Sequence, residues 1–440
     1  MSKDLPADQS RIRKWLQESH PLTLSLFAAI SAFCLYTCIY ALRKTFAVAT
    51  FEGLSYAGVD YKIWLVTFQV AGYASSKFAG IKIISELRAA SRGMGILICV
   101  TIASLSWLLF ALVPAPYNLL FLFTNGFPLG LVWGMVFGYL EGRRNTDFLG
   151  ASLAVSFIFS AGLCKSVGGF IMRDWHVSET WMPFVGALVF MAPLLFFLWL
   201  LNQVPPPTAA DEMHRTKRQP MAGPERKAFV SRFFFGLVLI VLFYAMLTTF
   251  REFRDNFSAD IWKSLGYGNS PEIFTATETP ISIACLVMIG SMVMIRDNRK
   301  ALQVIHWLIL AGSILVGVAT WLFQEQMISA PVWMTLIGLG LYLGYIPFNS
   351  SFFDRLLATF HVSGTVGFVM YVADSVGYVG SVSVLFYKQF GHRNLSWLDF
   401  FSGSAYVLSI AGSLLVIGSM IYFNARWKSQ VRDSEKLFQK

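Results

Sequence analysis

Apolar runs of about twenty residues recur along the whole chain and alternate with short polar stretches. A run of this length spans the hydrocarbon core of a bilayer as an α-helix, at about 1.5 Å per residue. Gly and Ser within several runs favour close helix packing in lipid. The pattern predicts twelve membrane-spanning helices, near residues 22–51, 62–84, 92–113, 117–140, 148–172, 179–203, 231–253, 272–295, 300–323, 329–353, 362–388 and 398–425.

One long polar stretch divides these segments into two sets. Residues 205–227, "PPPTAADEMHRTKRQPMAGPERK", are rich in Pro and charged side chains, which is typical of a flexible linker. Weak similarity between the ends of the fourth and tenth segments favours two pseudo-symmetric halves. We therefore expect an N-terminal segment (1–21), an N-terminal six-helix half (22–203), a linker (204–230), a C-terminal six-helix half (231–425) and a tail (426–440).

Composition and charge agree with an all-α membrane protein and exclude a soluble core. Hydrophobic residues make up 55% of the chain and charged residues 14%, with a mean hydropathy of +0.57. Lys and Arg are roughly four times as frequent in cytoplasmic as in external loops when both termini are placed inside, as the positive-inside rule requires. The net charge of +10 therefore indicates loops near anionic lipid and not a nucleic-acid partner. The N-terminal segment lacks the pattern of a signal peptide, and we expect a multi-pass protein of the bacterial inner membrane with both termini cytoplasmic.

Chemistry-bearing motifs of enzymes do not occur in the sequence. The five cysteines all fall within apolar runs, their number is odd, and none has metal-ligand spacing. A nucleophile–base pair and a nucleotide-binding loop are also missing. The sequence predicts a protein that is not an enzyme and that binds neither a metal nor a cofactor.

Two lysines lie near the middle of predicted helices. Lys77 occurs in "AGYASSKFAG" and Lys165 in "FSAGLCKSVGG". A Lys at a helix centre costs about 2.5–3.5 kcal/mol on insertion scales, so it faces a cavity or a partner. Either these lysines belong to a binding site, or they form internal salt bridges with Glu278 or Asp374.

Two arginines occupy matching places in the two halves. Arg43 follows about twenty apolar residues, so it could end its helix and extend to the interface, but apolar and small residues resume after it. Arg251 has the same place in the second half, although it could instead pair with Asp255 one turn later. If the helices continue, pseudo-symmetry brings the two arginines face to face across a central cavity.

The interior charges do not balance. With Lys44, five cations lie within predicted helices, against two acids, Glu278 and Asp374; Glu141 and Glu252 are left out because they lie near predicted helix ends. A positive excess at low dielectric is unstable unless an anion fills the cavity. Because Arg suits bidentate recognition of phosphate or carboxylate, the residues alone predict a carrier of a small anion.

Tyrosines accompany these cations at helical spacing. Tyr36 and Tyr40 share a helix face with Arg43, and Tyr73 precedes Lys77 by four residues. Phenolic hydroxyls near a cation can donate to the same oxyanion, so we expect the tyrosines in the binding site. Simple packing explains each of them equally well.

Several of these motifs resemble the organophosphate:phosphate antiporters of the major facilitator superfamily, which include the glycerol-3-phosphate and hexose-phosphate transporters. The similar stretches are "YTCIYALRKTFA" (36–47), "YASSKF" (73–78), the Arg251 that leads "FSADIW", and Glu278 near the start of the eighth segment. The resemblance implies two six-helix halves with the substrate between them. By position, the phosphate-binding arginines would be Arg43 and Arg251, the second-helix lysine Lys77, and the first-helix tyrosines Tyr36 and Tyr40.

Lys165 departs from the family pattern, since it stands where the family has a histidine and adds a fixed charge there. Three functions remain open. The first is exchange of an organic phosphate for inorganic phosphate by alternating access. The second is proton-coupled symport of an organic carboxylate, with Asp374 or Glu278 as the proton site. The third is a non-transporting sugar-phosphate sensor of the same fold. In each case we expect a monomer.

Overall fold

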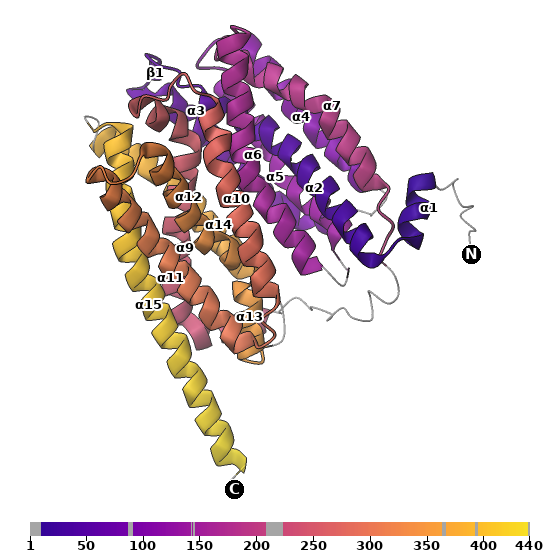
Figure 1. The fold of residues 1–440 in the computed structure, drawn as a ribbon, viewed down its shortest axis with the longest axis vertical. Helices are drawn as coiled ribbons and strands as arrows, with labels where there is room; N and C mark the ends of the chain where they lie inside the picture. Colours follow the sequence, from indigo (N-terminus) through magenta and orange to yellow (C-terminus); the bar gives the residue numbers. More distant parts are fainter. Residues whose placement is uncertain are drawn as a thin grey trace. The chain divides into compact units, whose positions relative to one another are not determined.

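The computed structural model describes residues 10–86, 91–141, 143, 146–207, 223–362, 367–391 and 395–438. These residues are folded almost entirely into α-helices (Figure 1). Two short strands, β1 (Ser55–Tyr56) and β2 (Val59–Asp60), pair antiparallel in a hairpin before α3. The prediction of an all-α protein is confirmed.

The chain divides into two compact units. Unit 1 comprises Met1–Phe46 and Thr67–Thr216, and unit 2 comprises Ala47–Val66 and Lys217–Lys440. Unit 1 holds α1 (Arg11–Glu18), α2 (Pro21–Lys44), most of α3 (Tyr61–Glu86), α4 (Arg92–Leu112), α5 (Leu119–Leu140), α6 (Thr146–Asp174) and α7 (Met182–Asn202), and the 3₁₀ turn η1 (Thr45–Val48) follows α2. Unit 2 holds α9 (Gly223–Ser264), α10 (Glu272–Val293), α11 (Asn298–Gln324), α12 (Ala330–Pro347), the π-helical η3 (Phe348–Phe352), α13 (Phe353–Thr359), α14 (Gly367–Gly391) and α15 (Trp397–Phe438).

Ten helices are long and apolar enough to cross a membrane, counted over the residues that the structure describes. The remaining two predicted segments, 62–84 and 362–388, coincide with α3 and α14, although residues 363–366 lie outside the described part. The helices thus follow the hydropathy pattern closely, and they mark the chain as an integral, multi-pass membrane protein. The side of the membrane on which each terminus lies stays a prediction.

Helix α9 is longer than predicted at both ends. It begins at Gly223, inside the expected linker, and ends at Ser264, beyond the expected end at residue 253. The extension follows from a stripe of buried side chains, Phe253, Phe257 and Ile261, at helical spacing. Polar residues between them lower the mean hydropathy without interrupting the buried face. Helix α15, the long yellow helix of Figure 1, likewise continues to Phe438, through the segment predicted as a tail.

The segment Ala47–Val66 belongs with unit 2, although it lies within the predicted N-terminal half. Lys62 Nζ lies 2.6 Å from Asp260 Oδ2 on α9 and also donates to a backbone oxygen, that of Ala47. The Gln389 side chain of α14 donates to the Gly58 carbonyl in the hairpin. These contacts attach the hairpin to the ends of α9 and α14.

Helix packing in unit 1 depends on two glycines. A Cβ on Gly72 of α3 would collide with the carbonyl oxygen of Phe123 on α5, and a Cβ on Gly126 of α5 would collide with the carbonyl oxygen of Gln69 on α3. The two backbones therefore approach each other directly, as small residues allow within lipid. This approach fixes the position of Tyr73, the residue that follows Gly72.

Candidate functional site

Arg43 is buried at the point where α2 changes into the 3₁₀ turn η1. The chain continues to Val48 without reaching an exposed helix end, so Arg43 does not simply extend to an interface. The carbonyls released by this change in helix type are satisfied by neighbouring helices. Gln69 donates to the Arg43 carbonyl at 2.7 Å, and Trp107 and Asn125 donate to the Leu42 carbonyl.

The side chains that hold this turn were missed by the sequence reasoning, which considered the charged residues and the tyrosines near them. Gln69 and Asn125 are fully buried and also bond to each other at 3.0 Å. An amide side chain in the middle of an apolar helix is a signal that could have found them, since such groups bond across helices in membranes.

The Arg43 guanidinium lies over the ring of Tyr73, with 3.7 Å from its central carbon to the ring centroid. The cation–π contact orients the guanidinium between α2 and α3. Tyr73 was expected beside Lys77, and the structure shows that it contacts Arg43. The side chain of Lys77 lies outside the described residues, so its predicted role stays a prediction.

Tyr36 and Tyr40 are buried against α6, where both pack on Phe157, with centroid distances of 5.0 and 6.5 Å. These rings therefore shape the interior of unit 1 next to Arg43. Whether their hydroxyls contact a substrate stays a prediction.

Unit 1 has a basic interior. Arg43, Lys44 and Lys165 are all buried, whereas none of the acidic side chains that the structure describes in this unit is buried. The described interior of unit 1 thus carries three positive charges and no carboxylate. An interior of this kind attracts anions.

Arg251 of unit 2 resembles Arg43 in its surroundings but not in its charge balance. It is buried on α9 with its guanidinium 4.3 Å from the ring centroid of Tyr345 on α12. Its Nη2 also donates to Glu252 Oε1 at 2.7 Å, so Glu252, the next residue, forms an ion pair with this arginine, whereas the alternative had named Asp255. Leaving Glu252 out of the interior charges was wrong: α9 continues to Ser264, and Glu252 is only 2% exposed.

A second buried ion pair joins α9 to α10. Arg254 Nη1 lies 2.7 Å from Glu278 Oε1, and Arg254 Nη2 donates to the Met334 carbonyl of α12 at 3.0 Å. Gly338 makes room for this arrangement, because a Cβ there would lie 2.8 Å from Arg254 Nη2. The sequence reasoning missed Arg254 because it ended the helix at residue 253. Glu278, one of the two acids expected as a partner for Lys77 or Lys165, thus bonds Arg254 within unit 2.

Asp374 on α14 receives a hydrogen bond from Tyr244 on α9, with an O–O distance of 2.7 Å. The Tyr244 ring stacks on Phe348 at a centroid distance of 4.2 Å, and next to Tyr345 at 5.7 Å. The Asn349 amide donates to the Tyr244 hydroxyl. An aromatic layer thus connects Asp374 to the Tyr345 ring under Arg251.

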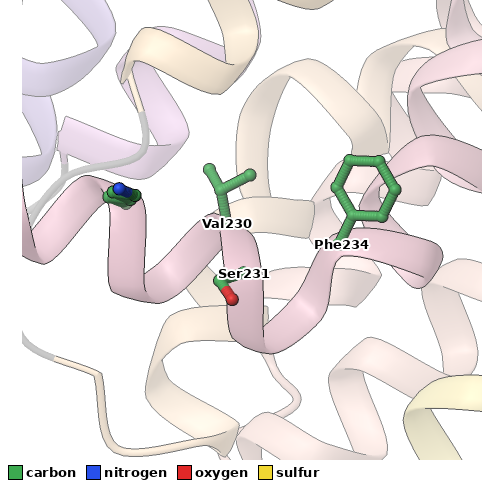
Figure 2. Close-up of a pocket in the computed structure, with 4 residues that line it drawn as sticks. Val230, Ser231 and Phe234 are labelled. Atoms are coloured by element: carbon green, nitrogen blue, oxygen red, sulfur yellow. The ribbon is translucent and has the colours of Figure 1, made fainter.

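A surface hollow lies outside these clusters. It runs along the first turns of α9 and is lined by Lys227, Val230, Ser231 and Phe234 (Figure 2). All four residues belong to one helix, and none is a predicted site residue.

The fold is that of the major facilitator transporters, as predicted. The D-xylose–proton symporter shares it at 18% identity, over 91% of this chain and 97% of that chain, with a TM-score of 0.58. The nucleoside transporter NupG shares it at 14% identity, over 91% and 100%, with a TM-score of 0.57. The peptide transporter POT shares it at 13% identity, over 90% and 94%, with a TM-score of 0.60.

The sequence of residues 45–426 matches a family described as "Family of unknown function (DUF5690)", and the chain belongs to that family. No curated protein matches the chain. The narrower resemblance to organophosphate:phosphate antiporters stays a prediction.

Proposed function

We propose that the chain is a secondary transporter that exchanges an organic phosphate for inorganic phosphate by alternating access, in the inner membrane of a bacterium. The observation that carries the proposal is the basic interior of unit 1, with Arg43 oriented on Tyr73. A buried guanidinium has a fixed positive charge and five donors, which suits the oxygens of a phosphoryl group. The fold agrees with transport, since the solved structures that share it are named as transporters.

The two units contribute unequally in this proposal. In unit 1, Arg43, Lys44 and Lys165 attract the phosphoryl group, with Lys77 as a further cation and Tyr36, Tyr40 and Tyr73 around it. In unit 2, Arg251 binds the same class of anion more weakly, because Glu252 already balances its charge. Replacing Arg43 should therefore impair exchange more than replacing Arg251 does.

The test is uptake of radiolabelled phosphate into proteoliposomes that are preloaded with unlabelled phosphate, without a pH gradient. The unmodified protein should exchange phosphate, and Arg43→Gln should lose exchange. Arg43→Lys should also impair it, because Lys keeps the charge and loses the planar donor geometry. Arg173→Gln is the matched control, since Arg173 is exposed and pairs with its neighbour Asp174. Absence of exchange by folded protein, or full exchange by Arg43→Gln, contradicts the proposal.

A proton-coupled symporter of an organic carboxylate is the second candidate, and Asp374 is the observation that favours it. Its carboxylate accepts a hydrogen bond from the neutral hydroxyl of Tyr244, and this candidate places the coupling proton on Asp374. Uptake that requires a pH gradient and is lost in Asp374→Asn would support this candidate over phosphate exchange.

A further inference from the structure

Tyr244, Asn349 and Asp374 bring three elements of unit 2 together. Tyr244 comes from α9, Asn349 from η3 and Asp374 from α14. The Tyr244 hydroxyl lies 2.7 Å from Asp374 Oδ1 and 3.2 Å from Asn349 Nδ2. From this cluster we propose that unit 2 binds a primary ammonium group, and that the transported phosphate compound is a zwitterion that carries an amine. The inference rests on the proposed function for its phosphate half.

The cluster is held rigidly on its buried side. Tyr244 is completely buried and stacks on Phe348 at an interplanar angle of 15°. Helices α9 and α14 meet closely here, since a Cβ on Gly377 would lie 2.9 Å from the side chain of Thr248. A donor fixed in this way orients the carboxylate before any ligand binds.

The hydrogen bonds among Tyr244, Asn349 and Asp374 leave these three side chains with free acceptors and no free donors. A tyrosine hydroxyl has one proton, and the Tyr244 proton goes to Asp374 at 2.7 Å in preference to Asn349 Oδ1 at 3.3 Å. Both protons of the Asn349 amide are used as well, on the Tyr244 hydroxyl and on the Tyr345 carbonyl at 2.9 Å. What remains is Asp374 Oδ2 and Asn349 Oδ1.

An acceptor-only pair distinguishes an ammonium from a hydroxyl group. A primary ammonium has three donors and no acceptor, so it can bond to both oxygens and still bond to water. A hydroxyl has one proton and two lone pairs, so it can satisfy only one of the oxygens. Asn349 is exposed and Asp374 half-buried, whereas Tyr244 is buried, so a ligand can approach the cluster at Asn349 and Asp374.

The charge balance of unit 2 also favours an ammonium group as the ligand of Asp374. The two buried arginines of α9 are already neutralised, Arg251 by Glu252 and Arg254 by Glu278. Within the part of the chain that the structure describes, Tyr244 is the hydrogen-bond partner of Asp374, and it is neutral. A carboxylate in a membrane-spanning helix generally pairs with a cation or marks a substrate path. A substrate ammonium supplies the missing positive charge.

The experiment compares two probes that differ in one group, 2-aminoethyl phosphate and 2-hydroxyethyl phosphate. Binding of each to the purified full-length protein is measured by calorimetry, beside the phosphate-exchange assay. We expect the amine probe to bind about tenfold or more tightly, as a charge-assisted hydrogen bond allows. The preference should disappear in Asp374→Asn and decrease in Tyr244→Phe. Asp399→Asn, the same change at an exposed N-terminal position of α15, should keep it.

The outcomes separate the inference from the proposed function. Phosphate exchange with equal binding of the two probes overturns the amine site and leaves the exchanger intact. Amine preference that depends on Asp374, without phosphate exchange, supports the site and overturns the exchanger. A third outcome is equal binding of the two probes together with uptake that requires both a pH gradient and Asp374. In that case Asp374 carries the coupling proton, and the inference is overturned. The readout is the ratio of the affinities for the two probes, measured within each variant. A substitution that weakens the binding of both probes equally leaves this ratio unchanged.

Discussion

The Arg254–Glu278 pair allows a quantitative test of how unit 2 is held together. Both side chains are buried, their ion-pair distance is 2.7 Å, and the pair joins α9, α10 and the Met334 carbonyl of α12. Glu278→Leu removes the carboxylate and leaves a buried guanidinium with one carbonyl partner. Removing one member of a buried ion pair costs about 3–5 kcal/mol, because the remaining charge is not compensated.

Removing both charges should cost much less. In Arg254→Met combined with Glu278→Leu, apolar side chains of similar length fill the space, and such replacements are often neutral or stabilising. The difference between the single and double variants therefore measures the unpaired charge and not the loss of packing. Glu325→Leu, the same change at an exposed position at the end of α11, is the control. Its unfolding free energy should differ from that of the unmodified protein by at most about 0.5 kcal/mol.

The assay is thermal unfolding of the purified protein in detergent. For a unit of about 150–250 residues, 1 kcal/mol corresponds to about 2–4 °C in Tm, so Glu278→Leu should lower Tm by about 6–20 °C. The double variant should recover most of that loss. A single variant that unfolds like the unmodified protein would refute the reasoning, and so would a double variant no more stable than the single one.

Three further predictions concern other contacts. Asn125→Leu leaves a backbone carbonyl at the end of α2 without one of its donors, so it should lower the unfolding free energy by about 1–3 kcal/mol in the same assay. Glu252→Gln removes the charge that balances Arg251, so phosphate should bind more tightly in equilibrium dialysis, and unchanged or weaker binding would contradict the unequal roles of the units. Lys62→Met leaves Asp260 without its ion-pair partner, so the hairpin should be less stable and amide hydrogen exchange over residues 47–66 should be faster. Exchange at the rate of the unmodified protein would show that the ion pair does not hold this segment.

The helices were predictable because one physical requirement dominates them. An apolar run must be about twenty residues long to cross the hydrocarbon core, and few soluble elements imitate it. The same requirement made Arg43, Lys165 and Arg251 visible, since a charge inside such a run is conspicuous, and the structure does bury all three. What hydropathy could not show is where α9 ends, because a mean over a window hides an apolar stripe that continues beside polar residues.

Partners of the charges were less predictable than the charges themselves. Adjacent residues on a helix point in different directions, so spacing alone favours Asp255 over Glu252 as the partner of Arg251. In the structure the Arg251 guanidinium lies over the ring of Tyr345 on α12 and bonds Glu252, the adjacent residue. The surroundings of a buried charge thus depend on neighbouring helices that are distant in the sequence.

The unequal charges of the two units follow from this pairing and have a consequence for transport. Arg43 and Arg251 are placed alike in the sequence and both lie on a tyrosine ring, and Arg251 also bonds the buried carboxylate of Glu252. An anion should therefore bind more favourably in unit 1, where the described interior is basic, than in unit 2. Unit 2 instead offers a carboxylate, Asp374, to a group of opposite charge. In the proposed transporter, the basic interior of unit 1 favours the phosphoryl group, and the carboxylate of unit 2 favours substrates with an amine over substrates without one.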